Sequence, residues 1–231
     1  MGLARVALIS LLLGLCALTV QAAAIDTFTL DQIGWQISGS TAYEIGITID
    51  AAGTDTDGRK WAALEISKKF RYGPDSQTGV IPSIVMDFTQ IADDANTATR
   101  LFIADESITN LTGEDWHDYY WILMRHGVAT FNQTLTNVGD PNGFSVAPFT
   151  QFQWTVNNAL DNEELKVSGG GTVPAGSIFL PGDGPGNLVI DIVPAGPRPM
   201  SFTFKQYPTP EPASMAFLLL GTVTMLRRRR R

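Results

Sequence analysis

The stretch Ile84-Val85-Met86-Asp87-Phe88-Thr89 shows the pattern that decides the fold class. Its large apolar residues Ile84, Met86 and Phe88 occupy every second position, so one face of an extended segment is apolar and the other faces water. We therefore predict a half-buried β-strand here. The same period of two recurs along the chain, in residues 45–49, 152–156, 188–192 and 201–205.

Clusters of Gly, Pro, Asp and Asn separate these alternating segments, as turns between strands require. They lie at residues 53–58, 139–143, 169–171 and 181–186. Many short strands without a sustained helical period predict an all-β fold. We expect a single β-sandwich of jelly-roll or immunoglobulin-like type over residues 25–205.

Helix is predicted to be scarce in this middle region. Ala159–Lys166 has a composition that favours two helical turns, and Trp61–Lys69 is ambiguous between helix and strand. Gln206–Thr209 is expected to be a linker after the last strand of the domain.

Residues 1–24 have the organisation of a secretory signal peptide. Arg5 precedes the apolar run Val6–Val20, and small residues follow up to Ala24, where we expect cleavage. An N-terminal anchor that is never cleaved is the alternative. Cys16 is the only cysteine and lies inside this segment, so the mature domain is expected to have no disulfide and no reactive thiol.

The C-terminal segment has three parts in a fixed order. Pro210-Glu211-Pro212 precedes an apolar run, Ala213–Leu226, that would span about 21 Å as a helix. Basic residues hold the end of such a run on the cytoplasmic side of a membrane. In this chain they are five consecutive arginines, Arg227, Arg228, Arg229, Arg230 and Arg231.

This tail resembles the PEP-CTERM sorting signal, which we assign to residues 206–231. The resemblance implies recognition by the membrane enzyme exosortase, cleavage near Pro210, Glu211 and Pro212, and removal of the helix and the arginines. It also implies a bacterium that makes extracellular polysaccharide and biofilm. The expected partners are signal peptidase, exosortase and, transiently, the cytoplasmic membrane. An unprocessed C-terminal anchor is the alternative, and both interpretations place the domain in the cell envelope or outside the cell.

The segment from Asn110 to Trp121 combines a turn with several aromatic residues. Its Asn110-Leu111-Thr112-Gly113 and Trp116 are similar to an N-x-T-G-x-x-W segment of other exported proteins that carry this tag. One interpretation is a connection between strands whose Trp116 packs across the sandwich. The other is an exposed platform of Trp116, Tyr119 and Trp121 that stacks on sugar rings.

Composition and motifs exclude several classes of function. The net charge of −7 argues against nucleic acid as a partner. The two histidines, His117 and His126, have no metal-binding spacing, so we predict no metal and no cofactor. The chain also lacks a nucleophile-elbow motif, and we predict that it is not an enzyme.

Three functions follow, in order of preference: a non-enzymatic exported protein of the cell surface or matrix, a carbohydrate-binding module for extracellular polysaccharide, and a polysaccharide-active enzyme. Buried tryptophans would favour the first, and an exposed row of aromatic residues the second. Two carboxylates about 5–10 Å apart in a groove would favour the third.

Overall fold

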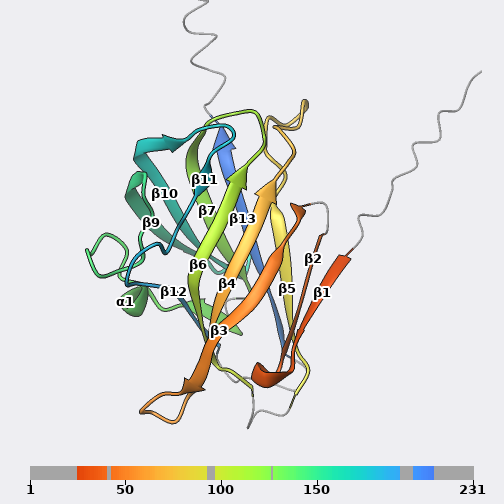
Figure 1. Ribbon diagram of the computed structural model, residues 1–231, viewed down its shortest axis with the longest axis vertical. Helices are drawn as coiled ribbons and strands as arrows, with labels where there is room; N and C mark the ends of the chain where they lie inside the picture. Colours follow the sequence, from red (N-terminus) through yellow and green to blue (C-terminus); the bar gives the residue numbers. More distant parts are fainter. Residues whose placement is uncertain (1–24, 41–42, 93–96, 126, 193–199, 211–231) are drawn as a thin grey trace, which may run out of the picture.

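The computed structural model describes residues 25–40, 43–92, 97–125, 127–192 and 200–210 (Figure 1). The predicted signal peptide and everything after Pro210 lie outside this range. Strands dominate the described chain, and the only helical elements in it are the single turns η1 (Asp31–Ile33) and α1 (Gln133–Thr136). The prediction of an all-β fold is confirmed.

The strands form two sheets. The first, sheet A, is antiparallel throughout, in the order β1 (Ile25–Leu30), β2 (Trp35–Ser40), β5 (Ile84–Gln90), β13 (Ser201–Pro210), β7 (Trp116–Met124), β10 (Asn162–Val173) and β9 (Phe149–Asn157). Sheet B has the order β3 (Gly46–Thr54), β4 (Lys60–Phe70), β6 (Arg100–Asn110), β12 (Leu188–Ile192) and β8 (Ala129–Phe131), with β11 (Ile178–Phe179) also paired to β6. Within sheet B, β4 and β6 run parallel to one another.

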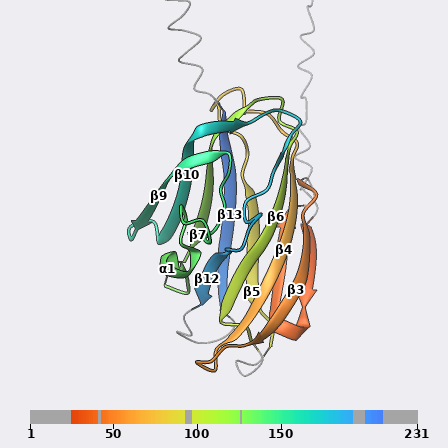
Figure 2. The ribbon, with the colours of Figure 1, turned by 60° about the vertical axis from the view of Figure 1, so that its left-hand side comes forward.

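The two sheets pack face to face around one hydrophobic core, and Figure 2 shows them as two layers. Phe70 of β4 meets Trp116 of β7 with ring centroids 5.3 Å apart. Phe131 of β8 meets Phe204 of β13 at 6.3 Å. Rings from opposite sheets therefore interdigitate, as in a β-sandwich.

The alternating patterns predict burial well in the central strands. Ile84, Met86 and Phe88 are fully buried, as the pattern of β5 requires. The pattern fails in β9, where Phe152 and Val156 are 45% and 51% exposed. These side chains are exposed because β9 is the edge strand of sheet A. The strand at the corresponding edge of sheet B, β8, has only three residues and is too short to cover β9.

The predicted helix is wrong, and the ambiguity over Trp61–Lys69 is resolved. Residues 158–161 form a hairpin turn in which the Asn157 side chain accepts hydrogen bonds from the amides of residues 159 and 160, so no helix forms over Ala159–Lys166. The rest of that stretch belongs to β10. Trp61–Lys69 is strand β4, whose two faces differ in burial.

The expected linker Gln206–Thr209 is instead the second half of β13. These residues pair with Trp121 to Asp118 of β7, and the Gln206 side chain is fully buried. Proline lacks a backbone donor, which normally excludes it from a central strand. The pairing of β13 with β5 ends at Gln206, so Pro208 and Pro210 lie where β13 has β7 as its only neighbour.

In Figure 1, β13 finishes near the top of the sandwich and β1 begins lower, on the right-hand side. Ile25 of β1 pairs with Ser40 of β2, and the neighbouring Gly39 pairs with Met86 near the start of β5. The start of β5 in turn pairs with Gln206. The register across four strands thus places the start of β1 level with Lys205, in the middle of β13, and β13 runs on from there to Pro210.

The N-x-T-G-x-x-W segment forms a hydrogen-bonded corner between β6 and β7. The Asn110 amide nitrogen donates to the carbonyls of Glu114, Val173 and Pro174 at 2.9, 3.0 and 3.1 Å. Its oxygen accepts from the Thr112 amide and hydroxyl, and that hydroxyl accepts from the Trp116 indole at 3.1 Å. The interpretation of Trp116 as a packing residue is confirmed.

Replacing Asn110 by Ala should lower the free energy of unfolding by about 2–4 kcal/mol, because three carbonyls lose a shared donor in a buried corner. Urea unfolding followed by tryptophan fluorescence measures the loss. The control Thr109→Ala, on the less buried face of the same strand, should cost about 1 kcal/mol or less. Equal losses in the two variants would contradict this account of the corner.

Candidate functional site

The predicted aromatic platform is wrong, because all three of its residues lie in the core. Trp116, Tyr119 and Trp121 are each 0% exposed. They point from β7 toward sheet B, where the Tyr119 ring contacts those of Phe70 and Phe179. None of the three can stack on a sugar ring without unfolding the sandwich.

The predicted sorting residues lie at the edge of the described chain or beyond it. Pro210 ends β13 and is paired with Trp116. Glu211, Pro212 and Arg227–Arg231 lie outside the described residues. Within the described part, no helix is long and apolar enough to cross a membrane.

A candidate binding site is a groove on the outer face of sheet B, which we call the sheet-B groove. Its first part is a hollow of about 500 Å³ over β3, β4 and β6, walled by Gly184 and Asn187. Its second part is a hollow of about 520 Å³ that shares Asp105 with the first. The side chains that give the groove its chemistry are Asp50, Asp55, Trp61, Glu65, Arg100, Phe102, Asp105, Asp183 and Asn187.

Two aromatic rings form the apolar part of the groove. Trp61 of β4 and Phe102 of β6 meet edge to face, with centroids 5.7 Å apart. The Trp61 ring also lies across Gly53 of β3, where an added Cβ would come within 2.9 Å of the ring. A side chain at position 53 would therefore displace the indole from this place.

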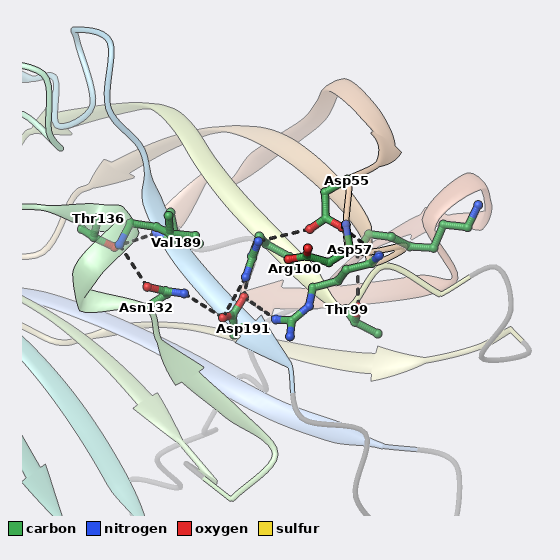
Figure 3. A network of polar contacts seen from close by, with 11 residues as sticks. Asp55, Asp57, Thr99, Arg100, Asn132, Thr136, Val189 and Asp191 are labelled. Atoms are coloured by element: carbon green, nitrogen blue, oxygen red, sulfur yellow. Dashed lines mark hydrogen bonds and ion pairs between the residues drawn. The ribbon is translucent and has the colours of Figure 1, made fainter.

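An ion-pair network holds the polar end of the groove (Figure 3). The Arg100 guanidinium donates to both carboxylate oxygens of Asp191, at 2.6 and 3.1 Å, and to Asp55 at 3.2 Å. Asn132 donates to Asp191 at 2.8 Å, and Arg59 lies 3.0 Å from the same carboxylate. Such bidentate contacts fix a guanidinium in one orientation.

The network also changes the acidity of its central carboxylate. Partial burial acts to raise the pKa of Asp191, but the hydrogen bonds from Arg100 and Asn132 outweigh it and hold the pKa below its ordinary value. Asp191 therefore stays ionised under mildly acidic conditions.

The groove combines an apolar ring surface with hydroxyl-binding groups. Binding sites for small polar molecules have this composition, with aromatic walls and a few placed polar side chains. Carboxylates accept hydrogen bonds from hydroxyls, amides both accept and donate them, and an indole provides a flat surface for an apolar ring face. Among the described residues no group of three or more His, Cys, Asp or Glu is arranged to hold a metal ion.

Trp61 carries a signal in the sequence that the period of two alone does not reveal. Once β4 is a strand, Trp61 shares its face with Glu65 and Ser67, whereas Leu64 and Ile66 face the core. A tryptophan on the polar face of a strand is a candidate for ligand contact.

Comparisons with protein-family models, with curated proteins and with solved structures found no match for this chain.

Asp191→Asn should lower the free energy of unfolding by about 1–2 kcal/mol near neutral pH, since it breaks a charge-assisted pair. A carboxylate with a depressed folded pKa stabilises the protein above its unfolded pKa, about 4, and that contribution is lost as the pH falls through the folded value. The gap between wild type and variant should therefore narrow on acidification. Urea unfolding as a function of pH measures it.

The control for this prediction is Asp183→Asn, which changes an exposed carboxylate. That variant should follow the wild type at every pH, within about 0.5 kcal/mol. A gap between wild type and Asp191→Asn that stays constant down to about pH 2.5 would contradict the assigned pKa direction.

Proposed function

We propose that this protein is an exported, exosortase-sorted component of the cell surface or extracellular matrix, with a non-enzymatic β-sandwich as its functional domain. The signal peptide would direct export, and Pro210, Glu211 and Pro212 would mark the site of processing. Arg227–Arg231 would stop transfer through the cytoplasmic membrane. The tripartite order of the tail is the observation that carries this proposal.

The arrangement of the domain supports the proposal. β1 begins level with Lys205, and β13 finishes at Pro210 five residues further toward the same side of the sandwich. A domain tethered at that side would present its opposite end, with the Arg100 and Asp191 network, away from the tether. The burial of Trp116, Tyr119 and Trp121 further favours a structural role for these residues.

We propose that the all-β domain is a sandwich of jelly-roll or immunoglobulin-like type. Its support is that consecutive strands repeatedly change sheets, as in β4 to β5, β5 to β6 and β6 to β7. Greek-key sandwiches are built from such crossings. The parallel pairing of β4 with β6 is a departure from the antiparallel pattern of both types.

The sorting proposal predicts two separate changes in the native chain. Intact mass and fractionation should show a protein that starts near Ile25, lacks Arg227–Arg231 and has left the cytoplasmic membrane. The variant Glu211→Ala with Pro212→Ala should keep its arginines and stay in the membrane fraction. This variant spares Pro210, so β13 remains as it is.

The matched control replaces one proline outside the motif, Pro185→Ala in the segment after β11. It should be processed like the wild type. A wild-type protein that retains the arginines in the membrane would overturn the sorting proposal and leave an anchored envelope protein.

The sheet-B groove favours carbohydrate binding as a second candidate function. Its Trp61 and Phe102 rings lie beside Asp50, Asp105 and Asn187. Because its rim carries several carboxylates, a neutral polysaccharide suits it better than an acidic one. A polysaccharide-active enzyme, the third hypothesis, would need two of these carboxylates to face one another across a bound chain.

Trp61→Ala should strongly weaken carbohydrate binding if the groove is the site. Affinity electrophoresis through gels containing neutral polysaccharides measures retention, and we expect roughly a tenfold or greater loss of affinity. Trp154→Ala is the control, because Trp154 is a second half-buried tryptophan, located on β9 of the other sheet. Equal retention of wild type and Trp61→Ala on every retaining gel would exclude the groove.

A further inference from the structure

The centre of the sandwich contains an amine, a carboxylate and a primary amide that lie away from solvent. Lys68 of β4 and Glu106 of β6 are each 1% exposed, and Gln206 of β13 is 0% exposed. Tyr119 and Trp121 of β7 complete the cluster and are also fully buried. Charged side chains are almost never buried to this degree unless they have partners.

The lysine lies within reach of both the carboxylate and the amide. Its Nζ is 2.5 Å from Glu106 Oε1 and 2.5 Å from Gln206 Oε1. The amide carbon of Gln206 is one C=O bond, about 1.23 Å, from that oxygen. A nucleophile at this range needs only a small rotation to approach the carbon, and holding the reactants together removes most of the entropic barrier.

The carboxylate bridges the attacking and the leaving nitrogen atoms. Glu106 Oε1 accepts from Lys68 Nζ and, at 2.9 Å, from Gln206 Nε2. A proton can therefore pass from the lysine to Glu106 and from Glu106 to the amide nitrogen. Trp121 donates to the other oxygen, Oε2, at 2.8 Å and holds the carboxylate in this orientation.

The amide carbonyl is polarised from a second direction. The Tyr119 hydroxyl donates to Gln206 Oε1 at 2.8 Å, the position at which negative charge develops when an amine adds to the carbon. A donor aimed there stabilises a tetrahedral intermediate, as the donors of an oxyanion hole do. Burial, and secondarily the Glu106 charge, raise the Tyr119 pKa well above its usual range, so the hydroxyl keeps its proton.

We propose that Lys68 and Gln206 form an intramolecular isopeptide bond, with Glu106 as the proton carrier. Lys68 gives a proton to Glu106, and its Nζ then attacks the amide carbon of Gln206. The new N–C bond forms, Glu106 delivers its proton to Nε2, and the bond from that nitrogen to the carbon breaks. Ammonia leaves and takes up the remaining proton, so an ammonium side chain and an amide become a secondary amide and ammonium without any oxidant.

The surroundings of Lys68 favour its reactive form. Burial, the largest influence, lowers the pKa of Lys68, although the Glu106 charge and hydrogen bond act against it. A desolvated lysine is more readily a free amine and thus a nucleophile. The aromatic side chains around the cluster keep water away, so the bond would not be exposed to hydrolysis once it had formed.

The bond would join β4 of sheet B to β13 of sheet A across the core. The two residues are 138 positions apart, so the cross-link closes most of the domain into one covalent loop. Disulfides stabilise exported domains in this way, and the only cysteine of this chain lies in the predicted signal peptide. The inference goes beyond the sorting proposal and does not depend on it, because all its residues belong to the described domain.

The test is mass spectrometry of the purified full chain after denaturation and proteolysis. We expect a branched peptide that joins Lys68 to Gln206 and is lighter than the sum of its two parts by one ammonia molecule. Glu106→Gln should abolish the branched peptide. The matched control is Glu163→Gln, which changes another buried glutamate outside the cluster and should keep it.

Other results would overturn the proposal. Separate, unmodified peptides for Lys68 and Gln206 in the wild-type protein would show that the cluster stays noncovalent. A branched peptide between Lys68 and Glu106, lighter by one water molecule, would assign a different bond. Both readouts use the wild-type chain, so they remain decisive even if Glu106→Gln fails to fold.

Discussion

The contact of Lys68 with Glu106 and Gln206 is the constraint on which the packing of the two sheets depends. An isolated charge in a dry core is costly, so the lysine on β4 and the glutamate on β6 have to lie side by side. The parallel pairing of these strands places Ile66 beside Glu106 and Ser67 beside Ser107, which brings Lys68 within reach. Gln206 then ties β13 of the opposite sheet to the pair. Removing one partner alone would leave the other charged and buried, at a cost of roughly 3–5 kcal/mol.

A β-bulge in β6 makes this arrangement possible and shapes the outer groove at the same time. Leu64 pairs with Ile103, but the next residue, Glu65, pairs with Asp105, so Ala104 is an extra residue in the ladder. Before the extra residue the odd-numbered side chains, such as Ile103, point into the core, and after it the even-numbered ones, such as Glu106, do so. Asp105 is therefore turned outward, to the point where the two hollows of the sheet-B groove meet. One inserted residue thus supplies a carboxylate to the core and another to the surface.

Partners that lie far apart in the chain set the limit of what the sequence could predict. Strict alternation identifies β5 and the first half of β13, whose faces are uniform, and it predicts the all-β class. It misplaces the end of the domain at residue 205, because Gln206 looks like a surface residue until its buried partners Lys68 and Glu106 are known. The aromatic platform failed for a related reason. The period of two showed that Tyr119 and Trp121 share a face, but only the packing of β7 against sheet B decides which face is inside. The groove could not be predicted, because its residues come from three strands and a loop whose proximity depends on pairing.

The end of β13 has a consequence for any enzyme that would act on the tail. Pro210 is paired with Trp116, so the first residue of the Pro-Glu-Pro motif belongs to the sheet and not to a spacer. An enzyme that cleaves near this motif would have to work against the end of the sandwich or act after Pro210. Pro208 and Pro210 have lost β5 as a neighbour, and a strand held on one side only separates from its sheet more easily than one held on both. Gln206, just four residues earlier, is held from both sheets through Lys68, Tyr119 and Glu106. The chain therefore changes from a strand anchored in the core at Gln206 to its tail within a few residues, and separation of residues 207–210 from β7 would leave the core contacts of Gln206 in place.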